Sequence, residues 1–391
     1  MLDPLFSWLL LLLGVVLGWA LARRHSVTAT ASGSEGYTGA QLGGLLNQLV
    51  SDDPDQAIAA LMAAAEFDSG TAELHLTLGK MFRKRGEMDR ALRIHEALTQ
   101  RENLPAALRT EAEFELAVDY MVAGVLDHAE QLFEQLAARG VNVAESLDAI
   151  RTIHEQARDW QLAIDAAQRL QSVKGESQRQ TIAQYHCELA DEARRAKQPD
   201  VAIRQVRAAL DQDSHCVRAL LLQGQLLEAQ ADFSGAAKAY LRAFEYDPRF
   251  LPDVIEPLQR CFAQTRDKER YLLFLSDAKE ISSSSLPFVA EARLLSETGV
   301  NPMDHLAQGL EQRPSRAVLA DFLDVLERQP DVVAAGLDKP AASLRKALLK
   351  LMESTPRYQC SNCGFSPRQM FWQCPGCKKW GTTAPADDVL R

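Results

Sequence analysis

Four cysteines near the C-terminal end have the spacing of a metal site. Cys360 and Cys363 form one C-x-x-C pair, and Cys374 and Cys377 form a second. Two residues between cysteines allow a tight turn to direct both sulfurs at one ion. Four thiolates predict a closed tetrahedral site for one zinc or iron ion. Because no coordination position stays open, such a site is expected to be structural or redox-active rather than hydrolytic.

The residues around these cysteines favour the same interpretation. Gly364 and Gly376 are expected to adopt the positive backbone angles that cysteine turns use, and Pro375 is typical of a turn. The segment is too short to bury much apolar surface. We therefore expect metal binding to supply its folding free energy.

The two motifs, C-S-N-C-G and C-P-G-C, resemble the metal knuckles of rubredoxin. An aromatic shell is expected around the ion, formed by Tyr358, Phe365, Phe371, Trp372 and Trp380. Only ten residues separate Cys363 from Cys374, far fewer than in an electron-carrying rubredoxin. The resemblance implies a shortened rubredoxin-like domain over residues 356–381, followed by a tail at 382–391.

The composition of the whole chain predicts a helical, acidic protein. Its 391 residues include 43 Lys and Arg against 53 Asp and Glu, a net charge of −10. This balance argues against broad contact with nucleic acid phosphates, which need a basic face. Aromatic residues are sparse, while alanine, leucine, glutamate, glutamine and arginine dominate, so the body should be helical. The cysteines outside the metal motif lie far apart, which fits a reducing compartment without disulfides.

The first residues predict a membrane anchor. Residues 5–22 carry no charge and are long enough, at about 1.5 Å per residue, to cross the hydrocarbon core of a bilayer. Arg23 and Arg24 follow this run, and the positive-inside rule then places the rest of the chain in the cytoplasm. We predict a single-pass transmembrane anchor at residues 1–25. A signal peptide cleaved after Ala22 is the alternative, and it would make the protein periplasmic.

Two further features belong to this N-terminal part. Gly14 and Gly18 form a G-x-x-x-G, a spacing that lets two membrane helices approach closely, although glycine is common in membrane spans. Residues 26–36 are small and polar without an apolar period, which predicts a flexible tether.

A repeat of about 34 residues fills much of the remaining chain. Small residues recur at intervals of 34, 38, 34, 39 and 34, at Ala57, Ala91, Ala129, Ala163, Ala202 and Ala236. Further buried-type residues stand four and seven positions after each alanine, so all three share one helical face. A preceding helix in several repeats carries a small residue of its own, as at Gly79, Ala117 and Gly224.

This pattern resembles the tetratricopeptide repeat family, whose period is 34 residues. The resemblance implies an all-α fold, with a superhelix of repeats over residues 37–248 and degenerate helical repeats over residues 249–355. Arg151 stands where a small residue is expected, so the hairpin that contains it should be irregular.

Tetratricopeptide arrays bind peptides in the groove lined by their first helices. Projecting the groove positions of the family onto this chain predicts a set of basic and apolar partner-binding residues: Lys80, Arg83, Lys84, Phe114, Met121, Arg194 and Arg195. Such a groove would suit an acidic, partly hydrophobic segment of a partner. A solvated cationic face is the alternative for each residue taken singly.

The sequence contains no phosphate loop, nucleophile elbow or convincing carboxylate pair, so we do not expect an enzyme. Anchor, Arg-Arg flank, repeats and terminal knuckle together resemble the family of lipopolysaccharide assembly protein B, also called YciM. The resemblance implies an inner-membrane regulator that promotes degradation of the deacetylase LpxC by the membrane protease FtsH, alongside other lipopolysaccharide assembly proteins. A periplasmic repeat scaffold and a rubredoxin-like electron-transfer protein remain as alternatives.

Overall fold

The computed structural model describes residues 69–386. The predicted anchor, with Gly14 and Gly18, lies outside the described residues, as do the tether and the repeat helix around Ala57. Between residues 69 and 386, no helix combines the length and the apolar character needed to span a bilayer. The chain divides into two compact units, with the division after Ser146.

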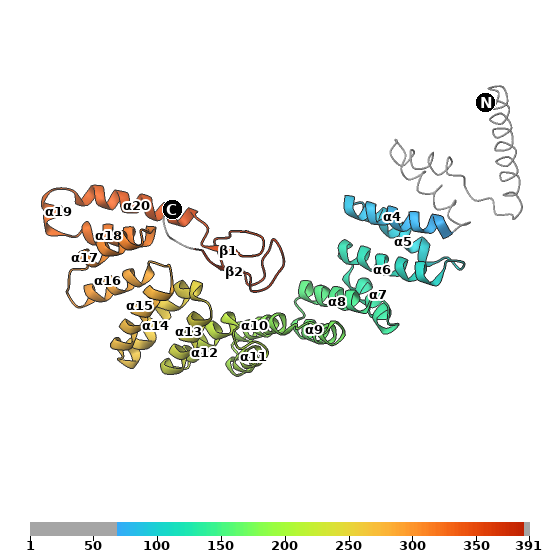
Figure 1. Ribbon diagram of the computed structural model, residues 1–391, viewed down its shortest axis with the longest axis horizontal. Coiled ribbons are helices and arrows are strands. Elements are labelled where there is room, and N and C mark those ends of the chain that lie inside the picture. The colour runs from blue at the N-terminus through green and yellow to red at the C-terminus, as the bar shows by residue number, and fades with distance from the viewer. Residues whose placement is uncertain (1–68, 387–391) are drawn as a thin grey trace, which may run out of the picture. The chain divides into compact units, whose positions relative to one another are not determined.

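The described part of the first unit consists of helices joined by short turns (Figure 1). They are α4 (Ser69–Arg85), α5 (Met88–Thr99), α6 (Ala106–Ala123) and α7 (Leu126–Ala138). Helix α8 (Val143–Ala157) begins in this unit and continues into the second. Helix α4 packs on α5, α5 on α6 and α6 on α7, and the first helices α4 and α6 also touch each other, as in stacked helical hairpins.

The second unit is also built of helices that pack on their neighbours. Its helices are α9 (Trp160–Lys174), α10 (Arg179–Arg195), α11 (Pro199–Gln212), α12 (Val217–Ala229), α13 (Phe233–Tyr246), the 3-10 helix η2 (Pro248–Phe250), α14 (Leu251–Thr265), α15 (Lys268–Ile281), α16 (Leu286–Glu297), α17 (Met303–Gln312), α18 (Arg316–Leu326), α19 (Pro330–Ala334) and α20 (Asp338–Ser354). Beyond α20, strands β1 (Tyr358–Cys360) and β2 (Thr383–Pro385) pair antiparallel and hold together the two ends of the cysteine-bearing segment.

The alanines that define the repeat lie inside the packing of the paired helices. Within the described residues these alanines are completely buried, with 0% exposure at Ala91, Ala129, Ala163, Ala202 and Ala236. The residues four positions later are also buried: His95, Phe133, Ala167, Val206 and Tyr240. The predicted packing face of these second helices is therefore confirmed.

The small residues of the first helices face those larger partners. A Cβ atom added at Gly79 would lie 2.3 Å from Nε2 of His95, and one added at Gly224 would lie 2.4 Å from Cε1 of Tyr240. Both distances are too short for non-bonded atoms, so only glycine lets the paired helices pack around these buried rings.

Arg151 replaces the small residue in α8, as the sequence indicated. Its guanidinium donates to Asp148 Oδ1 at 2.7 Å and Glu155 Oε1 at 2.6 Å in its own helix. It also donates to the hydroxyl of Tyr185 in α10 at 2.9 Å. Helices α8 and α9 pack less closely than the paired helices next to them, so this hairpin is irregular.

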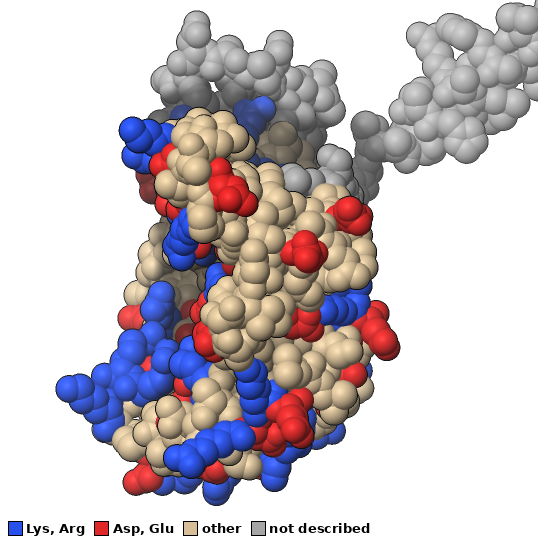
Figure 2. Space-filling view, turned by 90° about the vertical axis from the view of Figure 1, so that its left-hand side faces the viewer, with Lys and Arg blue, Asp and Glu red and all other residues tan. Residues whose placement is uncertain are grey.

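Helix α20 leaves apolar side chains in contact with solvent. Leu344 is 57% exposed and Leu351 is 60% exposed, whereas Ala341 is buried and the helix packs on α18. Figure 2 views the second unit from the side of its last helices, and charged side chains of both signs are interspersed there with uncharged surface.

Candidate metal centre

The four cysteine sulfurs converge on one point. All lie within 4.8 Å of one another, with 3.8 Å between Cys360 Sγ and Cys377 Sγ and 3.6 Å between Cys363 Sγ and Cys374 Sγ. In a tetrahedral zinc site with Zn–S bonds of about 2.3 Å, neighbouring sulfurs are about 3.8 Å apart. The donor set and its spacing therefore fit one tetrahedral zinc or iron ion, as predicted.

The two knuckles share one backbone pattern. In the first, the Cys360 N–H donates to Phe365 O at 2.8 Å, and the Gly364 N–H donates to Cys360 O at 2.9 Å. In the second, the equivalent bonds join Cys374 to Lys379 at 2.9 Å and Lys378 to Cys374 at 2.8 Å.

The prediction for Gly364 is confirmed, because its φ is +76°. The prediction for Gly376 is wrong, because the residue with positive φ in the second knuckle is Lys378, at +59°. The left-handed residue follows the second cysteine of each pair, and Gly376 lies between its two cysteines. A Cβ at Gly376 would lie 3.4 Å from Cys363 Sγ, which is van der Waals contact with the sulfur cluster.

Crowding of the sulfurs explains why a cation is needed. Burial acts to raise the pKa of Cys360, but the Thr382 hydroxyl and backbone N–H groups lower it to about 6. The N–H of Phe365 lowers the pKa of Cys363, yet desolvation and the three other sulfurs raise it to about 12. Four thiolates cannot all be stable together without a positive charge between them, which a divalent ion supplies.

Trp380 fixes the metal-bearing segment to the repeats of the second unit. Its ring meets the rings of Trp160 and Tyr185 edge-on, at centroid distances of 6.0 and 5.8 Å. Its Nε1–H donates to Glu155 Oε1 at 3.1 Å. Gln373 donates to the other oxygen of Glu155 at 3.2 Å, so one carboxylate holds two residues of the second knuckle.

Glu155 is itself held in place by the repeat helices. Arg151 pairs with it, and Tyr185 donates its hydroxyl proton to it. Burial is the main reason that the pKa of Tyr185 is raised well above its ordinary value, so Tyr185 stays protonated and can act as this donor.

Trp372 makes a second attachment. It stacks on Phe250 of η2 with ring planes 5° apart and centroids 5.6 Å apart. The Arg218 guanidinium of α12 lies over the Trp372 ring, 5.6 Å from its centroid. Of the five residues expected in the aromatic shell, Trp372 and Trp380 make these contacts with the repeats, and Phe365 is 40% exposed.

The basic residues predicted in the first unit form ion pairs. Lys80 Nζ lies 2.9 Å from Glu111 and 3.1 Å from Glu115. Arg83 binds Glu115 at 2.5 Å and Asp119 at 2.7 Å. These contacts join α4 to α6, so the charges of Lys80 and Arg83 are largely compensated within the protein.

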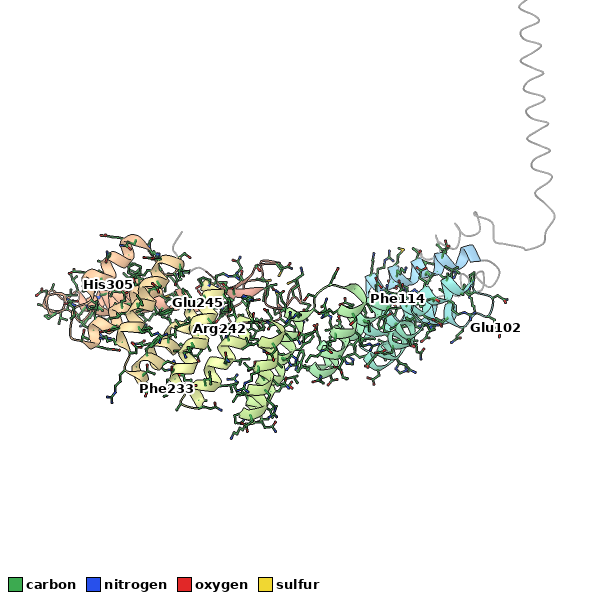
Figure 3. All side chains as sticks on the ribbon, turned by 60° about the horizontal axis from the view of Figure 1, so that its bottom comes forward. Glu102, Phe114, Phe233, Arg242, Glu245 and His305 are labelled. Atoms are coloured by element: carbon green, nitrogen blue, oxygen red, sulfur yellow. The ribbon has the colours of Figure 1, made fainter. Side chains whose placement is uncertain are left out.

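The other predicted groove residues differ in accessibility. Lys84 is exposed on the last turn of α4. Phe114, labelled in Figure 3, is half-buried and meets Phe133 edge-on at 5.7 Å, and Met121 is half-buried on the same helix α6. In the second unit, Arg194 pairs with Asp191 at 2.9 Å, and Arg195 is exposed beside it.

The sequence interpretation missed the residues that receive the tail. Glu155, Trp160 and Tyr185 carry no motif, and their partners in the tail lie about two hundred positions away along the chain. The one sequence feature that pointed to this contact was the residue type of Trp160, because the chain has only five tryptophans. A buried indole usually has a hydrogen-bond partner, and Trp160 Nε1–H donates to Glu192 at 2.9 Å.

Comparison with known proteins identifies relatives of the whole chain. Residues 358–385 match the family described as a rubredoxin metal binding domain. Lipopolysaccharide assembly protein B of Escherichia coli K12 is 30% identical over 390 residues, covering 98% of this chain and 98% of that protein. The protein of that name from Haemophilus influenzae is 28% identical over 402 residues, covering 99% of each. Among solved structures, YrrB, described as a TPR protein with an unusual peptide-binding site, aligns at 19% identity and a TM-score of 0.32, covering 49% of this chain and 91% of its own.

Proposed function

Because the chain belongs to the family of lipopolysaccharide assembly protein B, we propose that it is a membrane-tethered scaffold that regulates lipopolysaccharide synthesis without catalysing a reaction. The relatives match it over nearly their whole length, so anchor, repeats and metal tail are proposed to serve one function. The proposed location is the inner membrane of a bacterium, with the repeats on the cytoplasmic side.

The observation that carries this proposal is the position of the metal tail. The knuckle lies against α8, α9, α10 and α12 through Trp380, Trp372 and Gln373. All four ligand positions are protein sulfurs, and such a closed site supplies structural stability. We therefore propose that the metal site keeps the knuckle against these helices, so that knuckle and repeats together can bind a client.

In the proposed mechanism, the protein brings a protease and its client together. The anchor pairs laterally with the membrane protease FtsH, through the close approach that Gly14 and Gly18 permit. The repeats and the metal tail hold the deacetylase LpxC, which is then degraded. Confinement to one membrane raises effective concentration to about the millimolar range for short flexible links, so weak individual contacts suffice.

The predicted groove residues differ in whether they are free to contact a client. Lys84 and Arg195 are exposed and are proposed to contact a client directly. Lys80 and Arg83 already bind acidic residues of α6, so charge reversal at Arg83 would also destabilise the first unit. A clean test of client binding in this region therefore uses Lys84→Glu alone.

The experiment that tests the function compares client abundance with and without the protein. Loss of the protein should let LpxC accumulate, and crosslinking in intact membranes should capture both LpxC and FtsH on the wild-type chain. An unchanged LpxC level after loss of the protein contradicts the proposal, and so does capture of neither partner.

A further inference from the structure

A pocket of about 610 Å³ lies between the second knuckle and the repeats of the second unit. The knuckle contributes Trp372 and the segment from Lys378 to Thr382, and the repeats contribute residues of α10, α12 and the end of α13. The volume falls within the range of about 300–1,000 Å³ that is usual for ligand sites.

Two deeply buried side chains that line this pocket have unmet hydrogen-bonding atoms. Arg218 is 4% exposed, and its Nη2 binds Glu188 and Asp191, but its Nε and Nη1 have no hydrogen-bond partner. Gln184 is 8% exposed, and its Oε1 has no partner. A buried polar atom without a partner costs about 1–3 kcal/mol. Because these atoms have almost no accessible surface, a bound polar group reaches them only if neighbouring side chains shift.

The charge at the pocket is positive. Lys378 is exposed and its ammonium has no ion pair or hydrogen bond within the described residues, and Lys379 donates only to the neutral amide of Asn362 at 2.9 Å. The acidic groups of the lining are already engaged. Asp247 binds Arg249 at 2.7 Å, and Asp213 accepts the N–H of His215 at 3.0 Å.

Aromatic rings complete the lining. Tyr246, Phe250 and Trp372 offer apolar faces beside the amide of Gln184 and the two lysines. A bare inorganic anion would use the lysines and leave the rings unused. A peptide uses all three kinds of group, because its carboxylates meet the lysines, its backbone meets the amide and its apolar side chains meet the rings.

We propose that this pocket binds an extended acidic peptide segment that also carries apolar side chains, and that the bound metal ion is required because it holds one wall of the pocket. This inference rests on the proposed function and locates the recognition of a client at the junction of knuckle and repeats. Lys378 and Lys379 directly follow Cys377, so loss of the cysteine site displaces both lysines and Trp372 together.

The test measures peptide binding to the full-length, metal-loaded protein in detergent. The probe is a short labelled peptide that alternates Glu with Leu and Phe, and its twin has Gln in place of Glu. Fluorescence anisotropy should show binding of the acidic peptide that weakens with added salt, and the twin should bind at least about tenfold more weakly. Removal of the metal with a chelator should abolish binding.

The matched variants change the same number of charges at two places. Lys378→Gln with Lys379→Gln should weaken binding about tenfold, with metal content and Trp fluorescence unchanged. The control, Lys346→Gln with Lys350→Gln, removes two exposed lysines of α20 and should bind as the wild type does. Equal binding by both double variants contradicts the proposal, as does failure of the acidic peptide to bind.

A third arm offers vesicles containing anionic phospholipid. One outcome is that the wild type binds these vesicles and no peptide, and that the Lys378→Gln, Lys379→Gln variant loses the vesicle binding. That result would assign the pocket to a lipid surface and overturn the peptide proposal. The adaptor function has a separate readout in cellular LpxC abundance. If LpxC still accumulates on loss of the protein while peptide binding fails, the pocket assignment alone is wrong.

Discussion

Cys374 has no exposed surface, and its backbone N–H and C=O both close the second knuckle. Cys374→Ser should therefore remove the metal, because a hydroxyl replaces one of four thiolate ligands. We expect the metal content to fall from about one equivalent to near zero and the tail to leave the repeats. The helices should persist, since each repeat is stabilised by its neighbours. Elemental analysis and circular dichroism measure both effects.

The control for this change is Cys261→Ala. Cys261 is fully buried in the helical core of the second unit and far from the metal in sequence. Its loss should lower thermal stability and leave metal content unchanged. Retention of a full equivalent of metal in Cys374→Ser would contradict the assignment of that residue as a ligand.

Asp253 gives a pH-dependent prediction. Burial raises its pKa to about 6, and one carboxylate oxygen has no hydrogen-bond partner. The folded state therefore holds the proton more tightly than the unfolded state, and the contribution of Asp253 to stability falls as the pH rises toward and through 6. Asparagine does not titrate, so only the wild type loses this contribution. The free energy of unfolding of Asp253→Asn minus that of the wild type, measured with urea, should increase by about 1 kcal/mol from pH 5.0 to pH 7.5. Gln168→Ala, at an exposed helix position without a titrating group, is the control and should show no such change.

Spacing alone was enough to predict the metal ligands, since four cysteines in two pairs have few other uses. The same reasoning placed a left-handed residue at Gly376 and overlooked Lys378, because a non-glycine residue with positive φ has no clear signature in sequence. Glu155 was also missed, because its role depends on contacts that only the folded chain creates.

Paired helices are the element at which repeat packing can be tested. Gly224 of α12 faces the ring of Tyr240, which is 1% exposed and bonded to Glu228. Gly224→Ala should destabilise the protein by about 1–2 kcal/mol, because the ring must move, although alanine favours helix. Gln225→Ala, one position on and exposed, is the control and should be neutral or slightly stabilising. Urea unfolding measures the free energy of unfolding of both variants. Equal stabilities of the two variants would contradict close packing at Gly224.

The turns inside the hairpins explain why helices were easier to predict than their ends. A residue with positive φ ends the first helix of successive hairpins, at Gly86, Gly124, Arg158, Lys197, Ala231 and Arg266. The next residue donates its N–H back to the last turn, as Glu87 does to Phe82 O at 3.0 Å. In two hairpins this residue is a glycine, which predicts the turn from the sequence. In the others, the packing of the helices holds a non-glycine residue in the left-handed conformation.

At the scale of the whole molecule, local patterns could not predict where the tail lies. Trp380 and Glu155 are 225 positions apart, and no periodicity connects them. The helical repeats follow from alanine spacing, because neighbouring elements in a repeat array touch mainly each other. The docking of the knuckle depends instead on ring contacts and one shared carboxylate, which involve residue types found throughout the chain.

Membrane topology is a prediction at the same scale. Arg23 and Arg24 follow an uncharged run, so the C-terminus should be cytoplasmic. Alkaline phosphatase fused after Arg391 should be inactive, because that reporter needs the oxidising periplasm for its disulfides. The same enzyme placed behind a known signal peptide serves as the positive control. High activity of the Arg391 fusion would favour a periplasmic scaffold.

The half-life of LpxC in cells tests the adaptor account most directly. Cells should carry either the full chain or a chain without residues 1–22, at equal abundance, and LpxC decay should be followed after synthesis is stopped. We predict that the shortened protein still captures LpxC from lysate but leaves its half-life as long as in cells without the protein, because client and protease no longer share one surface. A normal, short LpxC half-life with the shortened chain would contradict tethering as the mechanism.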